Sequence, residues 1–166
     1  MTILVAAVVV IVDQLTKSWA LDNLTVPRHV LGPTNLVLTF NRGAAFSIGT
    51  GISPIVEAVV IVLVVVLVAF SSRMSRSAPV WASVALGLLL GGALGNLGDR
   101  LFRDIPFHPA AVVDFIQLVS WWPVFNVADA SIVAGVALLA LFYWKGGQRS
   151  GAGAAPPADI GWPGDG

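Results

Sequence analysis

The sequence predicts an all-α membrane protein with four transmembrane helices and a small extracytoplasmic β-sheet. Its composition is the first reason: 57% of the 166 residues are hydrophobic and 11% are charged, whereas an ordinary soluble domain is about 25% charged. The mean hydropathy is correspondingly high, at +0.87. The second reason is the presence of four apolar segments of membrane-spanning length, at about 2–21, 52–70, 80–98 and 128–144.

The charge balance and the missing residue types exclude several classes of function. Nine basic and nine acidic residues cancel, so no overall positive field indicates a nucleic-acid partner. The absence of cysteine excludes disulfides, thiolate metal sites and a cysteine nucleophile. His29 and His108 do not form the HExxH motif of metalloproteases. We therefore expect neither a metal ion nor a cofactor.

The first apolar segment, 2–21, carries two charged residues on one helical face. Asp13 and Lys17 are four residues apart, and the simplest interpretation is an ion pair at the membrane edge, with Lys17 reaching to the surface. A cleaved signal peptide is the alternative. It fits poorly, because the start lacks Lys or Arg and the apolar run leads into Asp13-Gln14.

The connection from Asp22 to Gly51 has the composition of short strands. Val30 to Phe40 is rich in β-branched and apolar residues and is interrupted by Gly32-Pro33, which predicts a small sheet at the membrane surface. Asn41 to Phe46 follows, where Asn and small residues suit either a plain hairpin turn or a close approach of the backbone to a ligand.

The second and third apolar segments differ in character. The second has no polar residue from Ala58 to Phe70. The third has a ridge of small residues at every fourth position, which favours close helix packing: Ser83, Gly87, Gly91 and Gly95. The next position on that ridge is Asp99. Asn96, Asp99 and Arg100 share one face at the end of this helix, aimed at the bundle interior. A solvated helix end with Arg100 paired to Asp99 is the alternative.

The second long connection, from Leu101 to Val127, leads into the fourth apolar segment. Val112 to Ile116 is predicted to be a short extended or interfacial piece, and Trp121 and Trp122 suit the lipid headgroup region. Asn126 and Asp129 share a face if the fourth helix starts early enough. Residues 146–166 are rich in Gly, Pro and Ala and are predicted to be a disordered tail, so residues 1–145 form a single membrane domain.

Four spans place both termini on one side of the membrane. The short connection 71–79 carries Arg73 and Arg76, which favours the cytoplasm for that connection and for both termini. The polar groups of four separate segments then meet at the outer membrane edge. Because charged groups are costly in a membrane, their convergence predicts a functional site there.

Two aspartates in that set, Asp114 and Asp129, fit the chemistry of an aspartic protease. Two adjacent carboxylates cannot both ionise, so the pair holds one proton and can act as base and acid together. Ser131 would need Lys17 as its base, and a metal site would need ligands that the histidines do not supply. A proton- or ion-coupled small transporter and a structural membrane protein remain as other classes.

Five motifs, in order, resemble the boxes of the bacterial lipoprotein signal peptidase family, signal peptidase II. They extend over most of the chain before the tail: VDQLTKSWA (Val12 to Ala20), FNRGAAFSI (Phe40 to Ile48), GALGNLGDR (Gly92 to Arg100), VVDFI (Val112 to Ile116) and FNVADASI (Phe125 to Ile132). The resemblance implies an aspartic endopeptidase of the bacterial inner membrane. It would cut prolipoproteins just before a cysteine that carries diacylglycerol.

The resemblance also implies residue roles. Asp114 and Asp129 match the family's catalytic pair, and Asn41 and Arg100 match positions that hold the substrate backbone. The remaining matches are supporting positions: Gly43, Asn96, Asp99, Asn126, Asp13 and Lys17. The family fold implies a β-cradle within 22–51 and a mobile periplasmic helix or loop between about 101 and 112. The implied partners are diacylglyceryl-modified prolipoproteins and membrane lipid, with no nucleic acid, and we expect a monomer.

Overall fold

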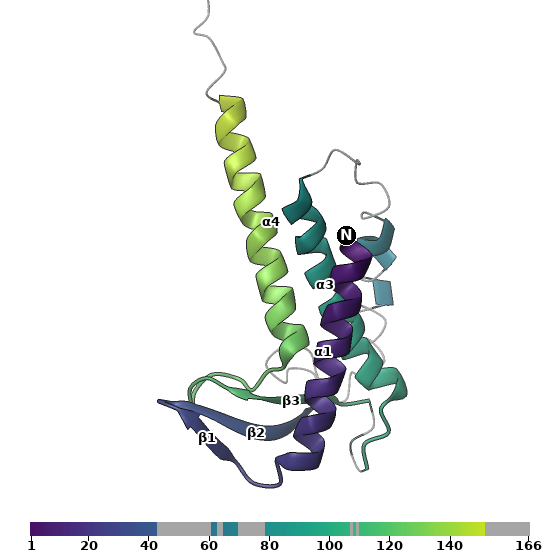
Figure 1. Ribbon diagram of the computed structural model, residues 1–166, viewed down its shortest axis with the longest axis vertical. Coiled ribbons are helices and arrows are strands. Elements are labelled where there is room, and N and C mark those ends of the chain that lie inside the picture. The colour runs from purple at the N-terminus through teal and green to yellow at the C-terminus, as the bar shows by residue number, and fades with distance from the viewer. Residues whose placement is uncertain (43–60, 63–64, 70–78, 107, 109, 152–166) are drawn as a thin grey trace, which may run out of the picture.

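In the part of the chain that the structure describes, three long helices stand side by side, and a small antiparallel sheet lies across one end of them (Figure 1). The computed structural model describes residues 1–42, 61–62, 65–69, 79–106, 108 and 110–151. Helices α1 (Thr2–Asn23) and α3 (Val80–Phe102) run towards the sheet, and α4 (Val127–Gly151) runs away from it. The carboxyl ends of two helices and the amino end of a third therefore meet at the sheet.

The helices confirm three of the apolar segments that the sequence predicts as helical. Within the described part of the chain, α1 and α3 are each long and apolar enough to span a membrane, and α4 carries a shorter apolar stretch, Val127–Leu141. Most of the predicted second span lies outside the described residues, with helical residues only at 61–62 and 65–69. The number of four spans therefore stays a prediction.

Helices α3 and α4 continue well past their predicted ends, whereas α1 ends only two residues after the predicted position. Helix α3 ends at Phe102 rather than at Gly98, because Asp99 and Arg103 form an ion pair across its last turn. Asn96, Asp99 and Arg100 are thus inside the helix and not at a solvated end. Helix α4 continues to Gly151, so residues 146–151, predicted as the start of a disordered tail, are helical. Residues 152–166 lie outside the described part.

The predicted ridge of small residues on α3 is confirmed as a packing surface against α1. A side-chain Cβ added at Gly91 would lie 2.7 Å from Val9 Cβ, and one at Gly95 would lie 2.6 Å from Asp13 Oδ2. Contacts that short are not tolerated, so only glycine lets the two helices approach this closely. The ridge therefore places the charged face of α1 directly against the polar end of α3.

Among the described residues, the sheet has three strands in the order β1 (Arg28–Leu31), β2 (Thr34–Asn41) and β3 (Val112–Gln117). The predicted break at Gly32-Pro33 is confirmed as the β1–β2 turn, with Gly32 at φ 54°, a left-handed conformation that suits glycine. The extended piece at 112–116 is also confirmed. Its antiparallel pairing with β2, which places Thr39 opposite Asp114, was not predicted.

Apolar side chains fix the sheet to the helix ends. Phe115 of β3 packs with Ala20 and Leu24 at the end of α1. Val113 packs with Ile105 and Ala111, and Leu21 packs against that second cluster. Neighbouring β3 residues are buried on both faces, so Asp114, between Val113 and Phe115, is held on a strand with little freedom to move.

Candidate active site

Asn126, the residue before α4, contacts both candidate catalytic aspartates. Its Oδ1 accepts a hydrogen bond from the backbone N–H of Asp129 at 2.9 Å, and its own N–H donates to Asp129 Oδ2 at 3.3 Å. This reciprocal pair is a capping box, which satisfies the free N–H groups of a helix start. Its amide Nδ2 donates to Asp114 Oδ1 at 2.6 Å. The local signal that begins α4 thus also brings Asp114 and Asp129 together.

Asp114 lies on β3 and is only 1% exposed. Asn41, at the end of the paired strand β2, donates from Nδ2 to Asp114 Oδ2 at 3.2 Å. Burial first, and then the nearby charge of Asp129, raise the pKa of the Asp114 carboxyl to about 7, even though these amide hydrogen bonds act in the opposite direction. Asp114 can therefore hold a proton at neutral pH.

Asp129 lies in the first turn of α4, and its carboxylate accepts hydrogen bonds from two donors. Asn96 Nδ2 of α3 donates to Asp129 Oδ1 at 2.8 Å, in addition to the backbone N–H of the capping box. The positive end of the α4 dipole also stabilises a negative charge at this position. The two carboxyl groups thus lie in different environments, since Asp114 is buried on a strand and Asp129 is partly exposed at the start of a helix.

A fully buried charge cluster lies behind the two aspartates. Lys17 Nζ lies 2.8 Å from Asp13 Oδ2 and 2.9 Å from Asp99 Oδ2, and all three side chains are 0% exposed. Its third hydrogen bond goes to Asn96 Oδ1 at 2.9 Å. The predicted ion pair of Asp13 and Lys17 is therefore confirmed, but the prediction that Lys17 reaches to the surface is wrong, because α3 covers that face of α1.

The cluster is connected to both strand and helix. Asp13 Oδ1 accepts a hydrogen bond from the backbone N–H of Ala128 at 2.9 Å, in the first turn of α4. Asp99 Oδ2 accepts one from the backbone N–H of Val113 at 3.1 Å, on β3. Lys17 itself is used entirely within the cluster, and the Ser131 hydroxyl donates to Val127 O. The structure therefore does not bring Ser131 and Lys17 together.

The remaining predicted residues have different outcomes. The alternative in which Arg100 pairs with Asp99 is not what the structure shows: Asp99 pairs with Lys17 and Arg103. Arg100 lies in the last turn of α3 and is half-buried. Gly43 and the rest of its motif after Arg42 lie outside the described residues. In the part of the chain that is described, no group of three or more His, Asp or Glu is arranged to hold a metal ion.

Two residues that bind the buried charge cluster are missed by the sequence analysis. Gln14 Nε2 donates to Asp99 Oδ1 and to Gly95 O, both at 3.0 Å, and Arg103 Nε donates to Asp99 Oδ1 at 2.9 Å. The spacing of four between Asp99 and Arg103 was a usable signal. It was lost because the helix was predicted to end before Arg103.

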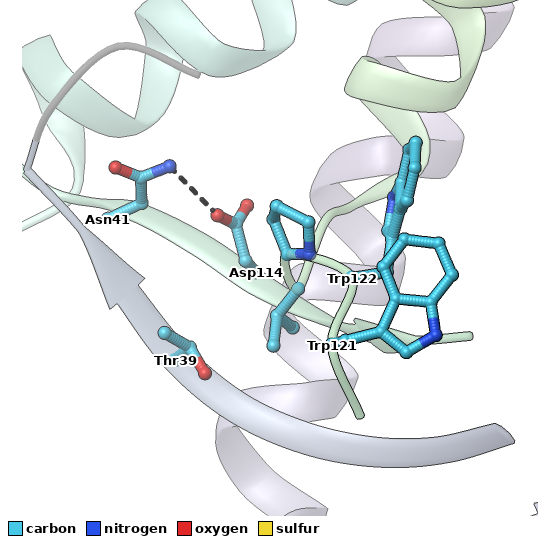
Figure 2. Close-up of a pocket in the computed structure, with 7 residues that line it drawn as sticks. Thr39, Asn41, Asp114, Trp121 and Trp122 are labelled. Atoms are coloured by element: carbon cyan, nitrogen blue, oxygen red, sulfur yellow. Dashed lines mark hydrogen bonds between the residues drawn. The ribbon is translucent and has the colours of Figure 1, made fainter. Parts of the chain in front are cut away.

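A pocket of about 370 Å³ opens beside Asp114 (Figure 2). Asn41 and Asp114 point towards one another on one side of it, and the rings of Trp121 and Trp122 stand on the other. The lining residues come from β2, β3 and the connection to α4: Thr39, Asn41, Asp114, Trp121, Trp122, Pro123 and Val124. The pocket offers an apolar and aromatic surface next to one titratable carboxyl group.

Comparisons with known proteins identify the family of this chain. The sequence profile of the family described as signal peptidase (SPase) II matches residues 5–145. The lipoprotein signal peptidase of Rhodococcus jostii is 45% identical over 150 residues, which cover 89% of this chain and 74% of that protein. That of Mycolicibacterium smegmatis is 41% identical over 164 residues, which cover 93% of this chain and 68% of that protein.

Two solved structures of bacterial membrane enzymes have a similar fold. One superposes with a TM-score of 0.75 at 32% identity, covering 87% of each chain. The other gives a TM-score of 0.73, also at 32% identity, over 86% of this chain. With the family profile and the close relatives, these matches show that the chain belongs to the signal peptidase II family, proteases that remove signal peptides from prolipoproteins.

Proposed function

We propose that this chain is an aspartic endopeptidase that cuts prolipoproteins just before a diacylglyceryl-modified cysteine, with Asp114 and Asp129 as its catalytic pair. The observation that carries the proposal is the double role of Asn126, whose side-chain amide and backbone bind one carboxyl group each. The family assignment supports the reaction. The transporter alternative receives no support from the comparisons, whose named relatives are signal peptidases.

The different surroundings of the two carboxyl groups suggest how they divide the work. In this scheme Asp129 is the ionised member, because the shared proton is on Asp114. Asp129 takes a proton from a water molecule as that water attacks the scissile carbonyl carbon. Asp114 holds the shared proton and donates it to the oxyanion, and the proton then passes to the leaving amine. No covalent intermediate forms in this scheme.

The pocket supports a placement for the substrate. A peptide segment lying in the pocket would pass between the Asn41 side and the Trp121–Trp122 side, with its scissile carbonyl near Asp114. Because Trp rings favour the lipid headgroup region, this opening lies at the level where a lipidated cysteine leaves the bilayer. Arg100 and the segment containing Gly43 complete the proposed substrate contacts, as the family resemblance implies.

The proposed orientation places this site at the outer face of the bacterial inner membrane. Helices α1 and α3 both run towards the sheet, while α4 runs away from it. A further span between α1 and α3 is required for two neighbouring spans to cross in the same direction. We therefore retain the proposal of four spans in one membrane domain over residues 1–145, with both termini in the cytoplasm. We also retain the proposal of a monomeric enzyme surrounded by membrane lipid.

The substrate proposal is tested by comparing two peptides with the same lipobox sequence. The purified protein in detergent is expected to cleave the peptide whose cysteine carries diacylglycerol. It should cleave the unmodified peptide at a rate at least about 100-fold lower, since remote binding energy contributes to the reaction rate. Cleavage products are measured by mass spectrometry. Equal rates on both peptides would show that the lipid is not recognised.

The raised pKa of Asp114 predicts the direction of the pH dependence. In the proposed scheme Asp114 must be protonated, and its protonated fraction falls as the pH rises through about 7. We therefore expect kcat/KM to decline on the alkaline side of about pH 7, as the pair loses its shared proton. The check is a rate profile from pH 5 to 9 in detergent. A rate that increases steadily up to pH 9 would contradict an acid role for Asp114.

A further inference from the structure

Arg103, at the carboxyl end of α3, connects two helices beside the buried charge cluster. Its guanidinium donates from Nε to Asp99 Oδ1 at 2.9 Å and from Nη2 to Gln14 Oε1 at 2.7 Å. Nη1 lies 3.4 Å from the hydroxyl of Ser18, also on α1. The side chain is 17% exposed. One planar group thus fastens the last turn of α3 to the face of α1 that carries the cluster.

Asp99 divides its two oxygens between different partners. Arg103 and Gln14 donate to Oδ1, while Lys17 and the backbone N–H of Val113 donate to Oδ2. Val113 directly precedes Asp114 on β3. The orientation of the Asp99 carboxylate, which Arg103 fixes, therefore sets the position of the strand at the residue next to the proposed acid.

The charges of the cluster balance only when Arg103 is included. Asp13 and Asp99 carry two negative charges, and Lys17 alone supplies one positive charge at 2.8 and 2.9 Å. Arg103 adds the second positive charge, so the group formed by the three-residue cluster and Arg103 is neutral. An excess charge in a buried site is costly, so without Arg103 the single ammonium group of Lys17 would have to compensate two carboxylates.

Lys17 also binds Asn96, and this contact depends on the charge balance of the cluster. Its remaining hydrogen goes to Asn96 Oδ1 at 2.9 Å, and Asn96 Nδ2 donates to Asp129 Oδ1 at 2.8 Å. A lysine drawn towards two uncompensated carboxylates would weaken that contact. Arg103 is thus connected to Asp114 through Asp99 and Val113, and to Asp129 through Lys17 and Asn96.

We propose that Arg103 is a positioning residue for the cleavage reaction: by binding Asp99 and Gln14, it holds both members of the aspartate pair in their working arrangement. The inference rests on the proposed function, because it takes Asp114 and Asp129 as the reacting groups. Arg103 does not line the pocket beside Asp114, so its effect is expected on the chemical step and not on substrate binding.

The test compares Arg103→Gln and Arg103→Lys with the parent protein, using a diacylglyceryl lipobox peptide in detergent. Functional sites are counted with a tight-binding, non-cleavable analogue of the peptide, so that kcat refers to folded enzyme only. For Arg103→Gln we expect kcat per site to fall about 10- to 100-fold with KM changed by less than about threefold. Arg103→Lys should lie between the two, since an ammonium group cannot hold Asp99 and Gln14 as the guanidinium fork does.

Arg28→Gln is the matched control, because Arg28 is exposed on strand β1, and it should keep the parental kcat. If Arg103→Gln gives no folded protein, Arg103→Lys decides the question by its kcat per site. Parental kcat per site in every folded Arg103 variant, or a raised KM at unchanged kcat, would overturn the positioning role. Asp114→Asn is assayed alongside: if it stays active, the proposed pair is wrong, whereas an inactive Asp114→Asn with normal Arg103 variants removes only the present inference.

Discussion

Asp114→Asn is expected to lower kcat by about 1,000-fold, as expected when a general acid is removed, while the protein stays folded. Asparagine has the shape of the protonated carboxyl group and keeps Oδ1 as an acceptor for Asn126 Nδ2. It cannot give up a proton to the oxyanion. The measurement is cleavage of a diacylglyceryl lipobox peptide, accompanied by a thermal melt of the same preparation.

The melt has a predicted direction of its own. The pKa of Asp114 is raised from 3.8 to about 7 in the folded protein, so folding favours its protonated form. The resulting stability is fully present below pH 3.8 and is lost as the pH rises through about 7. The asparagine variant cannot ionise, but its amide nitrogen also cannot accept the hydrogen bond that Asn41 gives to Asp114 Oδ2. We therefore expect the melting temperature of the variant, relative to that of the parent, to rise between pH 5 and pH 8. Loss of a cooperative melting transition would indicate that the variant loses activity by misfolding.

Asp129→Asn belongs to the same experiment and should be equally inactive, because the proposed base is gone. Its stability should fall modestly, by about 1–2 kcal/mol. In the parent, one Asp129 oxygen accepts from Asn96 Nδ2 and the other from the N–H of Asn126, and asparagine keeps only one of these two acceptors. Asp104→Asn is the matched control: Asp104 is exposed between α3 and β3, and its variant should cleave normally. Residual activity above about 10% in either dyad variant would exclude that residue from the mechanism.

The sequence predicts the parts of this site that depend on local patterns. The repeat of Gly87, Gly91 and Gly95 predicts a close helix contact. Residues 30–40, rich in β-branched residues and interrupted by Gly32-Pro33, predict two short strands joined by a turn. The spacing of three between Asn126 and Asp129 predicts a shared face for these residues, whereas the structure places Asn126 just before α4 and joins the two in a capping box. Each of these is decided by residues within a few positions of one another.

Features that depend on distant partners were not predictable in the same way. Nothing near Val112–Gln117 indicates that it pairs with β2, because strand pairing is settled by the whole fold. Lys17 was expected to reach the surface, since a lysine on an isolated helix does so. Its burial follows from Gly91 and Gly95, which let α3 come close enough to cover it. The information was in the sequence, but on another helix.

Lys17→Met is expected to prevent stable folding. Methionine fills a similar volume, but it leaves Asp13 and Asp99 buried side by side with no cation between them. Removing one partner of a buried ion pair costs about 3–5 kcal/mol, a large part of the stability of an ordinary domain. The measurement is the yield of monodisperse protein in detergent, together with its melting temperature. Lys145→Met is the control, because Lys145 follows Asp129 by 16 residues in α4, roughly 24 Å along the helix.

A second variant separates the charge imbalance from the loss of the lysine itself. Asp13→Asn combined with Lys17→Met removes one charge of each sign, and Asp99 keeps Arg103 as its partner. The double variant should therefore recover much of the folded yield that Lys17→Met loses. It should still cleave slowly, because Asn96 no longer has an ammonium group to hold its Oδ1 and its contact with Asp129 loosens. A parental melting temperature for Lys17→Met alone would show that the burial of Asp13 and Asp99 does not depend on Lys17. The charge cluster would then not be what holds Asp114 and Asp129 in place.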